Sequence, residues 1–153
     1  MHHDEGVEEA FYLTNCSMIL SFHIFNDFFQ GTGRITDIGE EEGSHYDMNI
    51  PLKKRIGDKN YIRTFKIITR EIIERYRPNA INLQFGADSI SYNKLGYFCL
   101  TVKGIGECVK YAKSIGLPMI LLGRGEYTIE NILVCRKYIM RIVLYFALEH
   151  FLF

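Results

Sequence analysis

LQFGADSISYNKLG, which spans Leu83–Gly96, joins an apolar run to a glycine and then to a carboxylate. We predict a buried strand over Ala80–Phe85, with Asp88 close behind its end. In parallel sheets, ligands collect beyond the carboxyl ends of the strands, which is where Asp88 would lie. The connection from Phe85 to Thr101 is also long for an α/β unit, a length typical of functional loops. Taken alone, Asp88 is equally typical of a turn or a helix cap.

Strand patterns alternate with amphipathic helix patterns along the chain, which is typical of an α/β domain with a mainly parallel sheet. Besides Ala80–Phe85, the predicted strands are Ser17–Ile24, Met48–Leu52 and Met119–Leu122, and a loop is predicted over Gly31–Gly43. The predicted helices run from Asp58 to Tyr76, from Thr101 to Ile115 and from Thr128 onward, with Asp58 and Thr101 as caps. Their predicted apolar faces are Tyr61, Phe65, Ile68, Ile72 and Tyr76, and Ile105, Cys108, Val109 and Ala112.

Composition favours one globular domain inside the cell. The chain has 153 residues, 48% of them hydrophobic, which is enough for one core. Lys+Arg and Asp+Glu both number 18, so the chain lacks the excess of basic residues that is typical of proteins in direct contact with nucleic acid. The four cysteines form no CxxC pair and are expected to be reduced thiols. The apolar tail Ile139–Phe153 is shorter than the roughly 20 residues of a membrane span, which favours a buried or partner-facing helix and no membrane contact.

Four segments in order resemble the class I histone deacetylases, zinc-dependent members of the arginase/deacetylase-like family. They are HHDEGVEEAFY (His2–Tyr12), SFHIFNDFFQGTG (Ser21–Gly33), LQFGADSISYNKLG (Leu83–Gly96) and GRGEYTIEN (Gly123–Asn131). The resemblance implies a partial three-layer α/β/α catalytic domain over residues 1–135, from the C-terminal part of the family's domain and incomplete at its N-terminal end. Residues 136–153 depart from the family and are expected to form a divergent, apolar, helical tail.

The resemblance also assigns a zinc site and a catalytic tyrosine. His2 matches the histidine of the family's Asp-x-His segment, Asp88 matches the distant aspartate, and the first aspartate would precede Met1. Without the resemblance, histidines at a chain end are more typical of a frayed terminus. Tyr127 matches the tyrosine that donates a hydrogen bond to the acetyl carbonyl as it becomes an oxyanion. Arg124 and Glu126 stand where the family has glycines.

Further residues match the family's tunnel and its monovalent cation sites. The tunnel residues are Phe29, Leu95 and Gly125, which are equally compatible with ordinary packing. One potassium site would use Ser21 and Phe22, and the other Phe11, Thr14, Ser17 and Tyr46. Lys94 matches one basic position of the family's inositol phosphate site, whereas Glu130 replaces an arginine there and argues against that ligand.

Two hypotheses of function follow. In the first, the chain is an incomplete zinc-dependent deacetylase of acetyl-lysine, acting on histone tails in the nucleus, with the cytoplasm as a second location, and in corepressor complexes that repress transcription. In the second, it is an inactive remnant or pseudoenzyme that acts as a protein-interaction module. The first is the main hypothesis. The second, the alternative, is supported because the family's tandem histidines lie upstream of Asp-x-His, and His23 and His45 do not match them.

Overall fold

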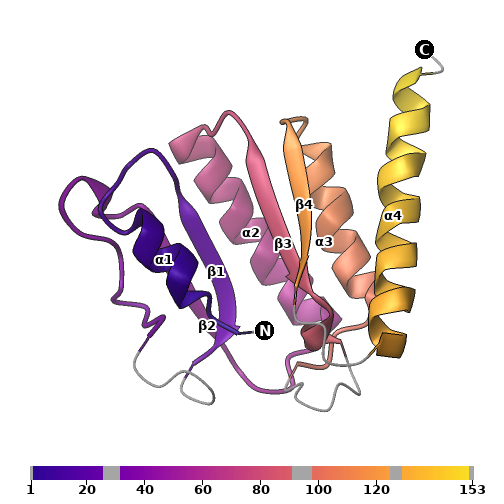
Figure 1. The fold of residues 1–153 in the computed structure, drawn as a ribbon, viewed down its shortest axis with the longest axis horizontal. Coiled ribbons are helices and arrows are strands. Elements are labelled where there is room, and N and C mark those ends of the chain that lie inside the picture. The colour runs from indigo at the N-terminus through magenta and orange to yellow at the C-terminus, as the bar shows by residue number, and fades with distance from the viewer. Residues whose placement is uncertain (1, 26–31, 91–97, 125–128, 152–153) are drawn as a thin grey trace. The chain divides into compact units, whose positions relative to one another are not determined.

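The computed structural model describes residues 2–25, 32–90, 98–124 and 129–151 (Figure 1). They form two compact units, Met1–Lys54 and Arg55–Phe153, and each is described by itself. The tail boundary predicted at residue 135 falls inside the last helix, so that division of the chain stays a prediction.

The first unit pairs two parallel strands behind one short helix. Helix α1 spans Glu5–Phe11, strand β1 spans Ile19–Ile24, the single 3-10 turn η1 spans Glu41–Gly43, and β2 spans Asp47–Leu52. The strands run parallel in register from Ile19 opposite Asp47 to Ile24 opposite Leu52. Both strands lie where the sequence predicted them, whereas η1 lies inside the segment predicted as loop.

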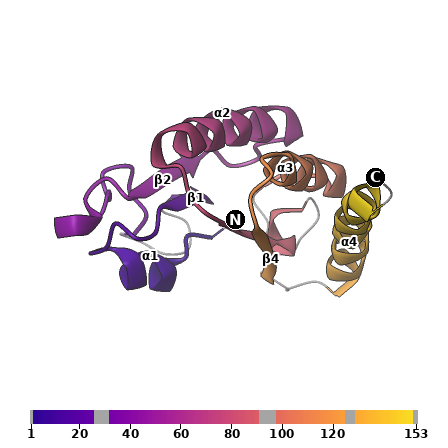
Figure 2. The same ribbon diagram turned by 90° about the horizontal axis from the view of Figure 1, so that it is seen from above.

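The second unit places helices on one face of another parallel pair (Figures 1 and 2). Its elements are α2 (Asp58–Tyr76), β3 (Ile81–Gly86), the 3-10 turn η2 (Ala87–Ser89), α3 (Val102–Ser114), β4 (Met119–Arg124) and α4 (Ile129–Phe151). The pair β3–β4 runs from Ile81 opposite Met119 to Gly86 opposite Arg124. The parallel pairs and alternating helices confirm the predicted α/β class, and α4 corresponds to the helix predicted from Thr128 onward.

The core of the second unit lies where α2 and α3 meet β3. Phe65 of α2 packs on Phe85 of β3 with ring centroids 6.0 Å apart. Ile105 and Val109 of α3 are completely buried, and the predicted apolar face of that helix is confirmed. On α2, Tyr61 and Phe65 are buried, whereas the remaining residues of the predicted face are only half-buried.

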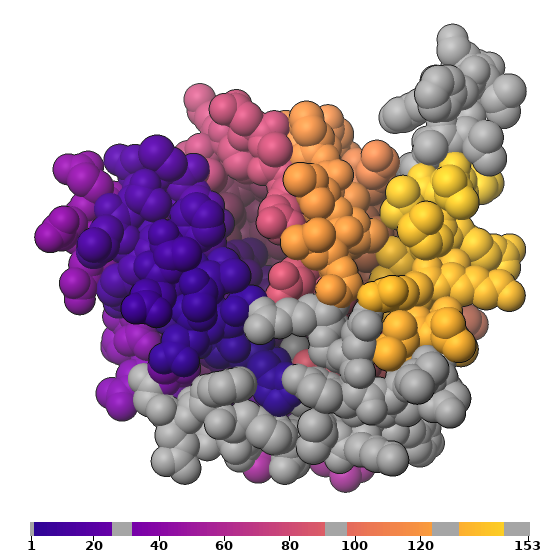
Figure 3. Space-filling model, viewed as in Figure 1, coloured from indigo at the N-terminus to yellow at the C-terminus, as the bar shows by residue number. Residues whose placement is uncertain are grey.

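The opposite face of β3 and β4 lies at the surface, where the orange atoms of β4 are visible in Figure 3. Asn82 and Gln84 are exposed, and they pair with Ile120 and Leu122, which are exposed too. The prediction that Ala80–Phe85 is buried throughout was therefore wrong. The strand alternates because α2 and α3 cover only one of its faces, and side chains alternate between faces.

Helix capping in the second unit differs from the prediction at one of two positions. Thr101 caps α3 as predicted, its hydroxyl accepting from the Gly104 N–H at 3.1 Å. Asp58 does not cap α2: Gly57 occupies the cap position. The Asp58 carboxylate instead accepts from the N–H of Thr101 at 2.8 Å and from its hydroxyl at 2.6 Å, which fastens the start of α3 to the start of α2.

Within the described residues, every helix is too short or too polar to span a membrane.

Candidate active site

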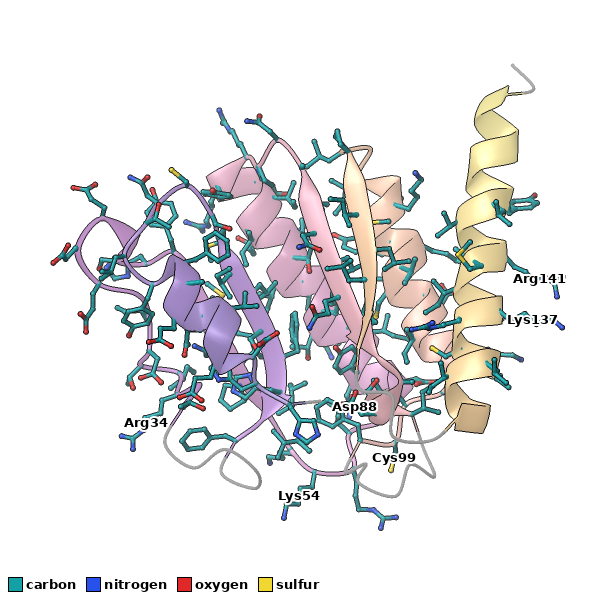
Figure 4. The ribbon with its side chains drawn as sticks, viewed as in Figure 1. Arg34, Lys54, Asp88, Cys99, Lys137 and Arg141 are labelled. Carbon is teal, nitrogen blue, oxygen red and sulfur yellow. The ribbon has the colours of Figure 1, made fainter. Side chains whose placement is uncertain are left out.

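Asp88 lies in η2, directly beyond the carboxyl end of β3 (Figure 4). It is only 4% exposed, and its neighbours Ala87 and Ser89 are buried as well. The Ser89 hydroxyl donates to the Gly86 carbonyl at 2.8 Å, which closes the tight turn that follows the strand. The sequence prediction that Asp88 lies close behind the end of this strand is confirmed.

The paired histidines at the start of the first unit have different surroundings. His2 is half-buried just before α1, whereas His3 is 6% exposed. The His3 ring contacts a Glu8 carboxylate oxygen at 3.3 Å through Nε2 and the Thr32 hydroxyl at 3.3 Å through Nδ1. Both ring nitrogens of His3 therefore already have polar partners, which argues against His3 as a substitute metal ligand.

His23 of β1 is completely buried and organises the turn at residue 33. Its Nε2 lies 2.8 Å from the Gly33 carbonyl, which can only accept, so Nε2 carries the proton. Its Nδ1 then accepts from the Ser21 hydroxyl at 2.8 Å, and burial lowers the pKa of the ring. A Cβ on Gly33 would approach His23 Nε2 to 2.6 Å and His3 Cγ to 2.8 Å, so this position requires glycine.

A buried polar cluster connects α1 to β2. The Asn49 side-chain amide donates to Glu8 Oε1 at 2.6 Å and to Asp47 Oδ2 at 3.1 Å. All three residues are less than 10% exposed. Burial, together with the hydrogen bond and charge of Glu8, raises the pKa of Asp47 to about 8. We infer that Asp47 keeps its proton near neutral pH, because burial beside the Glu8 carboxylate disfavours its charged form.

The residues predicted for the monovalent cation sites all belong to the first unit. Ser21 and Phe22 are consecutive in β1, and Phe11 and Thr14 are joined by a hydrogen bond of 3.2 Å from the Thr14 N–H to the Phe11 carbonyl. The Tyr46 carbonyl accepts from the Ile19 N–H at 2.9 Å, and Ser17 lies half-buried just before β1. A carbonyl has two lone pairs, so these bonds leave room for a cation, and the assignment stays a prediction.

Four predicted site residues lie outside the described residues: the proposed catalytic Tyr127 and the tunnel residues Phe29, Leu95 and Gly125. His2 belongs to the first unit and Asp88 to the second.

The described donors suit zinc in kind but not in number. Imidazole and carboxylate are typical zinc ligands, and a catalytic site uses three of them. Across residues 2–25, 32–90, 98–124 and 129–151, no group of three or more His, Cys, Asp or Glu side chains is placed to hold a metal ion. A cavity of about 210 Å³ beside α4 has an apolar lining that includes Phe85, Leu121 and Ile139, and no imidazole or carboxylate belongs to it.

The family model of the histone deacetylase domain matches residues 1–143, nearly the whole chain. This chain belongs to the histone deacetylase family. It is 51% identical to histone deacetylase 2 of Oryza sativa subsp. japonica over 138 residues, 90% of this chain and 27% of that protein. Over 90% of this chain it is also 48% identical to histone deacetylase B of Dictyostelium discoideum and 46% identical to histone deacetylase 1 of Homo sapiens. These alignments cover 33% and 29% of those two proteins, so the chain spans about a third or less of the relatives it matches.

Within this histone deacetylase chain, the sequence prediction missed the polar interior of the first unit. Neither Glu8 nor Asp47 lies in a local pattern that marks it as buried. The one available signal was the alternation of Asp47 and Asn49, which places two polar side chains on the same face of β2.

Proposed function

We propose that this chain carries the C-terminal part of the catalytic site of a zinc-dependent deacetylase that hydrolyses acetyl-lysine. The observation that supports this most directly is Asp88, a buried carboxylate in a tight turn at the carboxyl end of a parallel strand. Its place in the fold is where α/β enzymes collect their ligands. Membership of the family supplies the reaction class, and the substrates would be acetylated histone tails.

In this proposal, His2 and Asp88 are two of the zinc ligands, with a third donor needed to complete the set. Bound zinc would supply a nucleophilic water at neutral pH and polarise the acetyl carbonyl. The turn at Gly86–Ser89 would fix the Asp88 carboxylate, since the Ser89 hydroxyl closes it. The Tyr127 hydroxyl would donate to the developing oxyanion, a contribution on the order of 3 kcal/mol to the transition state.

Several finer features of the proposal come from the family alone. They are a nuclear location, corepressor partners, transcriptional repression and potassium at the two groups of carbonyl ligands in the first unit.

The alternative is an inactive family member that acts through protein contacts. The lack of a three-ligand group within the described residues favours it. Arg124 and Glu126, at positions where the family has glycines, favour it further.

One assay separates the two proposals. The 153-residue chain is incubated with zinc and an acetylated histone peptide, and both released acetate and bound zinc are measured. If the chain is a deacetylase, a hydroxamate chelator stops turnover. Tyr127→Phe then lowers kcat about 100-fold, whereas the exposed control Tyr145→Phe leaves it unchanged. Less than one tenth of an equivalent of bound zinc together with no acetate release would establish the inactive alternative for this chain.

A further inference from the structure

The last helix presents two contrasting faces. Cys135, Ile139 and Ile142 of α4 are buried, and this side faces α3, since a Cβ on Gly106 of α3 would meet Ile142 at 2.8 Å. On the far side, Leu133, Met140 and Leu144 remain 65%, 54% and 55% exposed. In Figure 3 the yellow atoms of α4 form an outer edge of the second unit.

These three exposed residues form one strip, here called the outer strip. They are spaced at i, i+7 and i+11, which at about 100° per residue places them within about 40° of one another around the helix. Arg136 lies on one side of the strip, about 60° from Leu133. Lys137 and Arg141 lie on its other side, and Figure 4 shows both pointing away from the unit. Two further exposed apolar residues, Val134 and Tyr145, lie beyond these cations, about 100° and 120° from Leu133.

Among the side chains that the structure describes on α4, the charge around the outer strip has one sign. Residues 132–145, whose side chains the structure describes, contain Arg136, Lys137 and Arg141, all exposed, and no Asp or Glu. A second copy of the same face would bring like charges together, which disfavours self-association. An acidic partner would instead gain complementary contacts on both sides of the strip, and arginine pairs with carboxylates particularly well.

The position of the cations distinguishes a protein groove from a lipid surface. Helices that lie on membranes bury a broad apolar face, with their cations at its edges. Here Lys137 and Arg141 lie between the outer strip and Val134, so burying the exposed apolar residues of α4 in lipid would carry both cations toward the acyl chains. A strip at this spacing is typical of a helix that inserts into a groove.

We propose that the outer strip of α4 docks into an apolar groove with an acidic rim on a partner protein. This binding surface is independent of the proposed deacetylase site, because its residues take no part in that chemistry. The match to the family model ends at residue 143, so Leu144 lies beyond it.

The test uses calcium-loaded calmodulin as the probe, because its grooves are apolar, its charge is acidic and it takes basic amphipathic helices. Binding of the full 153-residue chain is measured by calorimetry, beside vesicles of phosphatidylcholine with and without phosphatidylserine. We expect micromolar binding to calmodulin. Leu133→Gln/Leu144→Gln and Lys137→Glu/Arg141→Glu should each weaken it about tenfold or more.

The matched control is Lys59→Glu/Arg63→Glu, a second exposed pair at i, i+4, on α2, which should leave binding unchanged. All substituted positions are exposed, and thermal melts by circular dichroism check that each variant folds. The proposal is overturned by an absence of calmodulin binding or by binding that survives the leucine substitutions. It is also overturned if the chain binds phosphatidylserine vesicles more tightly than calmodulin, or if it forms a dimer that dissociates when the leucines are substituted.

Discussion

Among single residues, Asp47 is unusual because it is buried beside a second carboxyl group. Asn49 donates to both Asp47 and Glu8, and this one amide is the neutral bridge between them. The raised pKa of Asp47 means that the folded chain holds a proton that the unfolded chain releases at ordinary carboxyl pKa values. The contribution of Asp47 to the stability of the chain should therefore be largest below about pH 4 and should fall as the pH rises toward 8.

We predict that Asp47→Asn changes the free energy of unfolding more favourably at pH 8 than at pH 5, each measured against the unsubstituted chain at the same pH. The amide keeps a donor toward Glu8 and removes the titrating group, so the loss of stability across that interval becomes smaller. Urea unfolding at several pH values measures the difference in free energy of unfolding. Glu40→Gln, at an exposed position, is the control. An equal effect of Asp47→Asn at both pH values would contradict the raised pKa of Asp47.

At this scale, the sequence was informative where a residue belongs to a local motif. Asp88 could be placed because an apolar run and a glycine precede it directly. The contact between Glu8 and Asn49 joins residues 41 positions apart, and nothing in either neighbourhood indicates the other. Burial of Glu8 depends on this distant pairing, so helix periodicity alone could not predict it.

At the scale of elements, the turn η1 packs unusually closely on the segment after α1. The Glu40 N–H donates to the Tyr12 carbonyl at 2.9 Å. A Cβ on Gly43 would collide with the same Tyr12 carbonyl and approach the Thr14 N at 2.7 Å. These are backbone atoms, so they cannot move aside as a flexible side chain would.

We predict that Gly43→Ala destabilises the first unit by about 1–3 kcal/mol through this overpacking. The same substitution at Gly6, in α1, meets nothing within 4 Å and should stabilise by about 0.5–1 kcal/mol, because alanine favours the helix. Denaturant unfolding of the two variants measures both effects. Stabilisation by Gly43→Ala would show that the backbone there relaxes freely.

Elements with strong periodicity were predictable, whereas their surroundings were not. The boundaries of β1, β2, α2 and α3 agree with the sequence patterns to within two residues. The prediction that Asp58 caps α2 was wrong because its carboxylate accepts from Thr101 instead, and Thr101 lies 43 positions away in the sequence. The segment predicted as loop contains η1 because hydrogen bonds from neighbouring elements hold a turn that has no pattern of its own.

For the whole molecule, the two units are stabilised by different chemistry. The second unit contains the completely buried apolar residues of α3, whereas the first buries His23, Asp47 and Asn49. An overall hydrophobic content of 48% predicted one core and could not show this uneven distribution.

We predict that Ile105→Ala costs about 2–5 kcal/mol of stability, because it empties a completely buried position. Hydrogen exchange should accelerate in β3, β4 and α3 and remain unchanged in β1. Ile67→Ala, at a residue that is 44% exposed, should cost less than about 1 kcal/mol. Equal loss of protection in β1 and β3 would instead indicate that the two units unfold as one.

The parallel pairing of the strands has a consequence for the order of folding. Partners lie 28 positions apart in β1–β2, as between Ile19 and Asp47, and 38 apart in β3–β4, as between Ile81 and Met119. Each pair must close a long loop, and chain entropy is lost before the first hydrogen bond compensates for it. By contrast, α2 and α3 need only local contacts. Unpaired strand edges therefore persist after the helices form. During refolding at high concentration, they are the surfaces through which separate copies would aggregate.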